Sequence, residues 1–109
     1  MQGWLDDTIN AAKDLKNNPQ VNSVWLAGFG TGGALAITAA SLSEEISGVA
    51  AISAPSDFRD WAQNPDQLLQ YSRTVGAISD PDFPQDEDSW AAEIDLIRPV
   101  EAAGEIGKK

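Results

Sequence analysis

Two apolar runs that flank a glycine-rich turn and a helix of small residues constrain the fold of this chain more than any other feature. The first run, VNSVWLAGF, predicts a strand over residues 23–27. The turn GFGTGG and the small-residue segment GGALAITAASLSEE follow it, and the run SGVAAISAPSD then predicts a second strand over residues 49–53. Strand, helix and strand at this spacing predict a βαβ unit with parallel strands and a right-handed crossover.

An amphipathic helix is predicted ahead of this unit, over residues 3–17. Its apolar residues recur at helical spacing, and they are Trp4, Leu5, Ile9, Ala12 and Leu15. The two strands are apolar nearly throughout, which is typical of strands covered on both faces in a parallel sheet. Two parallel strands alone leave both outer edges unpaired. We therefore expect either pairing with another copy, as a homo-oligomer, or membership of a larger sheet.

The chain changes character after Asp57. Short helices are predicted over residues 58–63 and 66–75, joined by turns that contain proline, and a further helix is predicted from Ser89 with a break at Pro99. No third strand is predicted. The fold class is therefore α/β, in one partial domain of 109 residues: an α-β-α-β core over residues 1–57 and a helical half over residues 58–109.

The composition argues against several classes of partner. With 17 acidic and 7 basic residues and a formal net charge of -10, the surface repels nucleic acid and anionic membranes, which attract clusters of Lys and Arg. No apolar run approaches the ~20 residues of a membrane span, and no secretion signal is visible. The chain has no cysteine, which together with these features predicts a cytoplasmic protein.

Histidine is also absent, which removes the commonest general base and the commonest metal ligand. The acidic stretch near residue 80 lacks the alternating D-x-D-x-D-G pattern and the closing glutamate of a calcium loop. Its carboxylates are expected to be solvated, and they are Asp80, Asp82, Asp86, Glu87 and Asp88. We expect no metal and no cofactor.

The glycines allow two interpretations, of which the first is a dinucleotide-binding loop. Gly28, Gly30 and Gly33 satisfy G-x-G-x-x-G after a strand and at the start of a helix. In that setting backbone N–H groups bind a pyrophosphate. The fingerprint also requires an acidic residue about 20 positions later, at the end of the second strand, whereas the first carboxylate here is Asp57, well beyond that distance.

The second interpretation is a nucleophile elbow, the sharp strand-to-helix turn that presents a catalytic serine in the pattern G-x-S-x-G-G. Gly28, Gly32 and Gly33 match the glycines, and Gly30 occupies the serine position. Around these residues the order helix, VWLAGFGTGGALAI, helix, GVAAISAPSD resembles the central part of the α/β-hydrolase fold family. The tail DFRDW…DPDFP…W…IRPVEAAGEI is similar to the helical lid region of many bacterial members.

The resemblance implies an esterase-type fold, and the departures from it predict a chain without hydrolytic activity in isolation. Gly30 has no side chain, so the nucleophile is missing, and no histidine is present to activate one. The family's usual acid lies on a later strand, and the early strands that supply half of the oxyanion hole have no counterpart here. The position of Thr31 contributes a backbone N–H to the oxyanion hole in the family.

Asp57 follows the second strand, where open α/β sheets place ligands. The resemblance offers a second role, because an acid in this neighbourhood orients the histidine in some hydrolases, but the simpler expectation is that Asp57 caps the helix FRDWA. The ligand-binding candidates are therefore Gly28, Gly30, Thr31, Gly32, Gly33 and Asp57. Two alternatives stay open: a dinucleotide-binding module, and a non-catalytic protein that self-associates through its strand edges.

Overall fold

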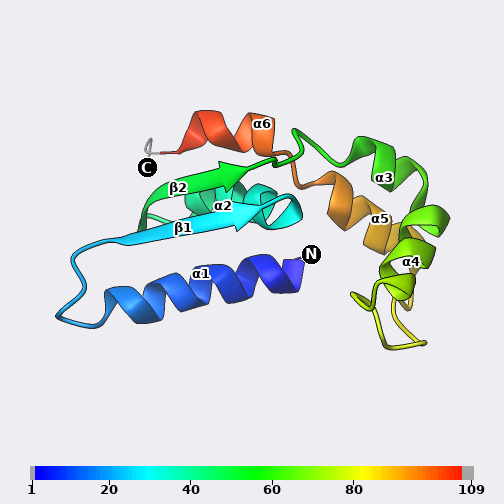
Figure 1. The fold of residues 1–109 in the computed structure, drawn as a ribbon, viewed down its shortest axis with the longest axis horizontal. Coiled ribbons are helices and arrows are strands. Elements are labelled where there is room, and N and C mark those ends of the chain that lie inside the picture. The colour runs from blue at the N-terminus through cyan, green and yellow to red at the C-terminus, as the bar shows by residue number, and fades with distance from the viewer. Residues whose placement is uncertain (1, 107–109) are drawn as a thin grey trace. The chain divides into compact units, whose positions relative to one another are not determined.

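The computed structural model describes residues 2–106, which form two compact units. The first unit contains residues 2–57 and 97–106, and the second contains residues 58–96. Figure 1 shows the elements, which are α1 (Gln2–Lys16), β1 (Val24–Phe29), α2 (Thr31–Leu42), β2 (Ile46–Ile52), α3 (Arg59–Gln63), α4 (Pro65–Thr74), α5 (Glu87–Asp95), α6 (Pro99–Ala102) and the short 3₁₀ helix η1 (Ala103–Glu105). Within residues 2–106, no helix has both the length and the apolar composition that a membrane span requires.

The sheet of the first unit confirms the α/β class. Among the described residues it has two strands, β1 and β2, which run parallel. The register pairs Val24 with Ile46 and, after an irregularity, Trp25 with Gly48. Helix α2 connects the strands and packs against both. In Figure 1 α2 lies behind the sheet, and β2 is on the side of β1 that a right-handed crossover requires.

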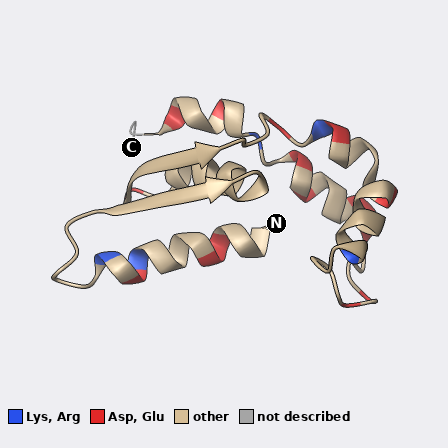
Figure 2. Ribbon diagram, in the orientation of Figure 1, with Lys and Arg blue, Asp and Glu red and all other residues tan. Residues whose placement is uncertain are grey.

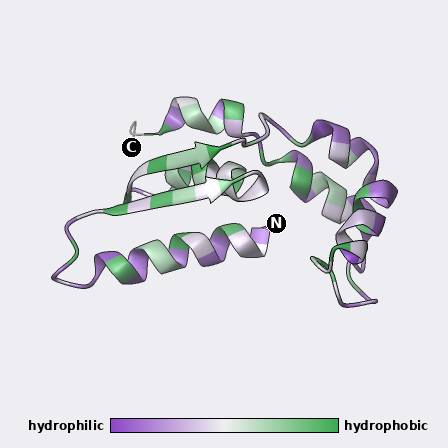
Figure 3. Ribbon diagram, in the orientation of Figure 1, coloured by the Kyte–Doolittle hydropathy of each residue, from purple (hydrophilic) through white to green (hydrophobic). Residues whose placement is uncertain are grey.

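The expectation that the strands are covered on both faces is wrong. Exposure alternates along β1: Val24 and Gly28 are buried, while Trp25 is 67% exposed and Phe29 is 71% exposed. The cause is that α2 lies on one face only, with α1 and α6 packed against α2. The outward face is nevertheless apolar, since neither strand carries a charged residue (Figure 2) and both are largely apolar in sequence (Figure 3).

Helix α1 matches the predicted helix to within one residue at each end. Its buried positions are Leu5 and Ala12, with Ile9 half-buried between them. This spacing places one stripe of the helix against the rest of the unit. Trp4 and Leu15, which the pattern also assigned to the apolar stripe, are 52% and 53% exposed.

Helix α2 is buried along most of its length. Its small residues allow it to lie close to the sheet. Its two buried hydroxyl groups bond to the helix itself: the hydroxyl of Thr38 donates to the Ala34 carbonyl at 2.9 Å, and that of Ser41 donates to the Thr38 carbonyl at 2.7 Å. Leu35 is buried as expected, whereas Leu42 is 53% exposed.

Two glycines set the distance between α2 and the sheet. A Cβ at Gly28 would lie 2.5 Å from the Gly32 carbonyl carbon and 2.6 Å from the Gly33 nitrogen. A Cβ at Gly33 would lie 3.0 Å from the Gly28 carbonyl oxygen. Because these neighbours are backbone atoms, they move only if the helix moves away from the strand. The first turn of α2 therefore rests directly on the end of β1.

We predict that Gly28→Ala destabilises the protein by about 3 kcal/mol, because the added methyl overpacks a backbone contact. Gly32→Ala is the matched control, since a Cβ at Gly32 meets nothing within 4 Å. The control is expected to leave stability unchanged or to raise it by less than about 1 kcal/mol. Urea unfolding followed by circular dichroism measures both variants. Equal stability of the two variants would contradict the close approach.

The second unit consists of α3, α4 and α5, which contact one another. The rings of Phe58 and Trp61 lie 5.1 Å apart, and those of Phe83 and Trp90 meet edge to face at 6.4 Å. Arg73 of α4 binds backbone oxygens of the acidic stretch: its guanidinium donates to the Pro81 carbonyl at 3.3 Å and to the Phe83 carbonyl at 2.9 Å.

Helix α5 begins two residues before the predicted start at Ser89. The N-cap is Asp86, whose carboxylate accepts from the backbone N–H groups of Asp88 at 3.1 Å and Ser89 at 3.3 Å. The Ser89 hydroxyl donates to the same carboxylate at 2.9 Å. These donors, the Ser89 hydroxyl first, lower the pKa of Asp86. One member of the acidic stretch, Asp86, thus caps the start of a helix while remaining exposed to solvent.

The capping role of Asp86 predicts a pH dependence of stability. Because its pKa is lower in the folded state, its contribution is complete above the ordinary carboxyl range and disappears as the pH falls through the lowered pKa. Asp86→Asn keeps a capping oxygen without a titrating group, so its stability relative to the original chain should improve as the pH falls. Glu87, whose pKa is raised by a hydrogen bond with Asp66, is common to both proteins and contributes equally.

Thermal unfolding between about pH 7 and about pH 3, a range that spans the ordinary carboxyl pKa, measures this difference. Asp86→Ala should be less stable than Asp86→Asn at every pH, because alanine removes the capping oxygen. A difference between Asp86→Asn and the original chain that stays constant with pH would contradict the assignment of Asp86 as the charged cap.

The predicted break at Pro99 is confirmed, and it returns the chain to the first unit. Helix α5 ends at Asp95, and α6 starts at Pro99 and packs against α2. The backbone N–H of Val100 donates to the Ser56 carbonyl at 3.1 Å. Residues 97–106 therefore group with the βαβ core, whereas the sequence assigned them to the helical half. The sequence and the structure both divide the chain after Asp57.

Candidate functional site

The turn between β1 and α2 gathers five of the six candidate residues. β1 ends at Phe29 and α2 begins at Thr31, so Gly30 alone reverses the direction of the chain. The other candidates flank it, with Gly28 inside β1 and the rest in the first turn of α2: Thr31, Gly32 and Gly33. The sixth candidate, Asp57, lies beyond the end of β2 and is half-buried.

Gly30 has an unusual backbone conformation, with φ 55° and ψ -124°. Residues with a Cβ avoid this region, and those held there carry about 1–3 kcal/mol of strain. Space is not the obstacle, since a Cβ at Gly30 would meet nothing within 4 Å. The turn thus combines a backbone conformation that strains any residue except glycine with open surroundings, the conditions under which an elbow exposes a side chain above a sheet.

Hydrogen bonds fix this turn to the neighbouring strand β2 and to helix α2. The Gly30 N–H donates to the Ile52 carbonyl at 2.9 Å, and the Gly30 carbonyl accepts from the Ala34 N–H at 3.2 Å. The first bond continues the sheet one residue past β1. It also occupies the Gly30 N–H, which a dinucleotide loop would direct at a phosphate. The N–H groups in the first turn of any helix have no carbonyl acceptor within the helix. In α2 these groups belong to Thr31, Gly32 and Gly33.

Gly33 brings the segment after β2 against the same turn. A Cβ at Gly33 would lie 3.4 Å from the Ala51 Cβ and 3.1 Å from the Ala54 Cβ. Any larger residue at position 33 would push the β2 end away from α2. Three of the glycines therefore have a structural role: Gly28 and Gly33 allow close packing, and Gly30 allows the chain to reverse direction.

Ser53 is a feature of this region that sequence reasoning missed. It directly follows Ile52, the acceptor for Gly30, it is exposed, and its φ is 55°. Such a conformation is uncommon for a residue with a side chain. A serine at a strand end gives no sequence signal of a positive φ, because serine is not among the residues that favour this conformation.

The expectation that Asp57 caps the following helix is wrong. Helix α3 begins at Arg59, and its N-cap residue is Phe58, whose side chain makes no capping hydrogen bond. The extra residue between Asp57 and Arg59 places the carboxylate one position too early for the cap. Among residues 2–106, no cluster of three or more carboxylates is arranged to hold a metal ion.

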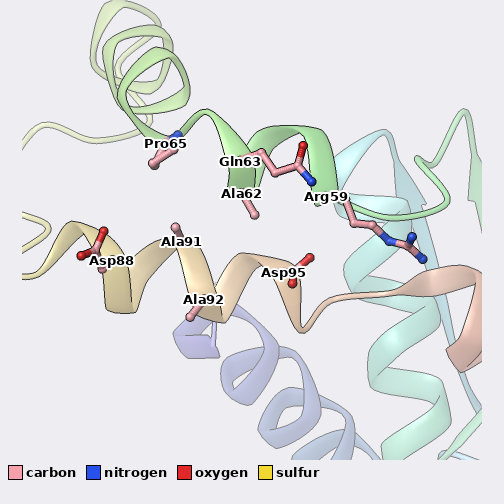
Figure 4. Close-up of a pocket in the computed structure, with 8 residues that line it drawn as sticks. All are labelled: Arg59, Ala62, Gln63, Pro65, Asp88, Ala91, Ala92 and Asp95. Carbon is pink, nitrogen blue, oxygen red and sulfur yellow. The ribbon is translucent and has the colours of Figure 1, made fainter.

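A cavity of about 510 Å³ lies within the second unit, between α3, the start of α4 and α5. In Figure 4 the methyl groups of Ala62 and Ala91 point into the space between the two helices. Polar side chains line the remainder, and they are Arg59, Gln63, Asp88 and Asp95. None of the candidate residues from the sequence lines this cavity.

The comparisons with known proteins identify no relative of this chain. No model of a protein family, no curated protein and no solved structure matches it. The geometry of the chain itself therefore carries the functional argument.

The backbone conformation of Gly30 predicts that any side chain at this position costs stability, whether or not it contacts a neighbouring residue. Gly30→Ala is expected to lower the free energy of unfolding by about 1–3 kcal/mol, although the methyl group enters open space. Urea unfolding, with Gly32→Ala as the comparison, measures it. A neutral effect of Gly30→Ala would show that the turn relaxes to an ordinary conformation.

Proposed function

We propose that this chain is an α/β-hydrolase-like protein whose nucleophile elbow keeps its backbone geometry but has lost the reacting atom. In this proposal the isolated chain does not hydrolyse esters. The observation that carries it is the conformation of Gly30, at φ 55° and ψ -124° between a parallel strand and a helix of small residues.

The surroundings of Gly30 support an elbow more than a dinucleotide loop. The Gly30 N–H is bonded to Ile52, and the strand-end residue Ser53 has no carboxylate to bind a ribose. The open space at the Gly30 Cβ position suits a side chain that projects toward a substrate. The N–H of Thr31 then stands where the family's oxyanion hole receives one of its donors.

The same residues account for the proposed lack of activity. Acyl transfer by this route needs a nucleophile and a base within hydrogen-bond reach. Gly30 offers no nucleophile, and the chain contains no histidine. Asp57 would then have no imidazole to orient. In this proposal the helices of the second unit correspond in sequence to the family's lid region.

A single introduced thiol tests the elbow without relying on activity. The chain has no cysteine, so Gly30→Cys carries one thiol, placed at the N-terminus of α2. Helix N-terminal N–H groups lower a thiol pKa from about 8.5. Gly76→Cys is the matched control, because Gly76 also has a positive φ of 82°, has nothing within 4 Å of its Cβ position, and follows the C-terminus of α4.

Alkylation by iodoacetamide as a function of pH gives both thiol pKa values. We expect the Gly30→Cys thiol to react at least about tenfold faster near pH 7 than the Gly76→Cys thiol, and its pKa to be at least about 1 unit lower. A thiol pKa at position 30 equal to or above that at position 76 would argue against the elbow.

Ester hydrolysis assays test the proposed lack of hydrolytic activity. The unmodified chain and Gly30→Ser are both expected to hydrolyse p-nitrophenyl acetate no faster than Gly76→Ser, because no base is available to activate the hydroxyl. Turnover by the unmodified chain would overturn the proposed inactivity. Saturable binding of NADH that Gly30→Val abolishes would instead favour the dinucleotide module.

A further inference from the structure

The outward face of the two-stranded sheet is an exposed apolar surface. It is formed by alternate residues of the strands, Trp25, Ala27 and Phe29 from β1 and their register partners Gly48, Ala50 and Ile52 from β2. Trp25 is 67% exposed, Phe29 71% and Ile52 49%. Figure 3 shows apolar colouring on both strands. We call these six residues the outer sheet face.

On the outer sheet face, the side chain of Trp25 reaches across from β1 to β2. The ring of Trp25 lies over Gly48, because a Cβ at Gly48 would fall 2.6 Å from Cε3 and 2.7 Å from Cη2 of that ring. The large side chain of β1 therefore fills the space above the smallest residue of β2. The outer sheet face thus presents apolar side chains that can pack against the same face of a second copy.

The charge distribution favours a second copy as the occupant of this surface. The chain has a formal net charge of -10, so two copies repel one another through most approaches. Neither strand carries an ionisable side chain, as Figure 2 shows, whereas α1 and α6 carry carboxylates. Packing one outer sheet face on another thus brings the uncharged surfaces together, while α1 and α6, which carry carboxylates, pack against α2.

The area of the face sets the strength of such an association. Trp25 and Phe29 expose roughly 300 Å² together, taking about 200 Å² for a whole aromatic side chain. Two copies would bury roughly twice that from their aromatic rings, with smaller additions from Ile52 and the alanines. Stable interfaces bury about 1,200–2,000 Å² in total. The area therefore suits a weak, reversible dimer and falls short of a permanent one.

We propose that two copies of this chain associate through their outer sheet faces, related by a two-fold axis, to form a weak reversible dimer. An isologous contact of this kind needs only one self-complementary patch. The association uses the face of the sheet and not its edges. It does not depend on the proposed loss of hydrolytic activity.

Sedimentation equilibrium of the whole chain, from about 10 µM to about 1 mM, tests the proposal. We expect a monomer–dimer equilibrium that strengthens when the salt concentration rises from about 0.05 M to about 0.5 M, because salt screens repulsion between like charges. Trp25→Lys and Phe29→Lys should each weaken dimerisation at least about tenfold, because each places an unpaired charge in the contact. Trp4 of α1 is also exposed, at 52%, and Trp4→Lys should leave dimerisation unchanged.

Hydroxyl-radical footprinting of the unmodified chain gives a readout that needs no variant to fold. Oxidation of Trp25 and Phe29 should fall as the protein concentration rises, while oxidation of Trp4 stays constant. A monomer at every concentration and salt level would overturn the proposal. A dimer that persists in both lysine variants would also overturn it and would assign the contact to a strand edge. A dimer that dissociates when the salt concentration rises would overturn it as well.

Discussion

The close contact between Gly28 of β1 and the first turn of α2 is the constraint on which the first unit depends. A Cβ at Gly28 would meet the backbone of Gly32 and Gly33, so the helix lies as near to the strand as main-chain atoms allow. This distance permits α2 to contact both strands, and α1 and α6 pack against α2 in turn. The small residues along α2 follow from the same requirement, since larger side chains would lift the helix from the sheet.

In the proposed function, the turn that follows from this packing is an elbow without its chemistry. Gly30 provides a conformation that costs energy for any residue with a side chain, and the space above it is open. A serine there would be strained but accommodated. A glycine at this position carries neither that strain nor a nucleophile, so the turn with Gly30 is less strained than the same turn with a serine would be.

The sequence predicts the elements well where periodicity and small residues decide them, and less well where tertiary contacts decide. Helix α1, the parallel pair of strands and the break at Pro99 follow from local pattern. β1 extends to Phe29, beyond the predicted end at residue 27, because Gly28 is held inside the sheet by α2. Helix α5 starts earlier than predicted because Asp86, one of several carboxylates in sequence, is the one that reaches the Ser89 N–H. Neither the positive φ of Ser53 nor the exposure of Trp25 leaves a local signature.

The hydrogen bond from Gly30 to Ile52 has a mechanical consequence. Most functional turns of α/β proteins can shift while the strands below them stay paired, since loops open at lower cost than sheets. Here the turn carries the last bond of the strand ladder, so it is part of the sheet rather than a loop attached to it. Gly30 cannot swing outward unless the strands begin to separate, and any molecule that binds above it meets a surface whose shape is already fixed.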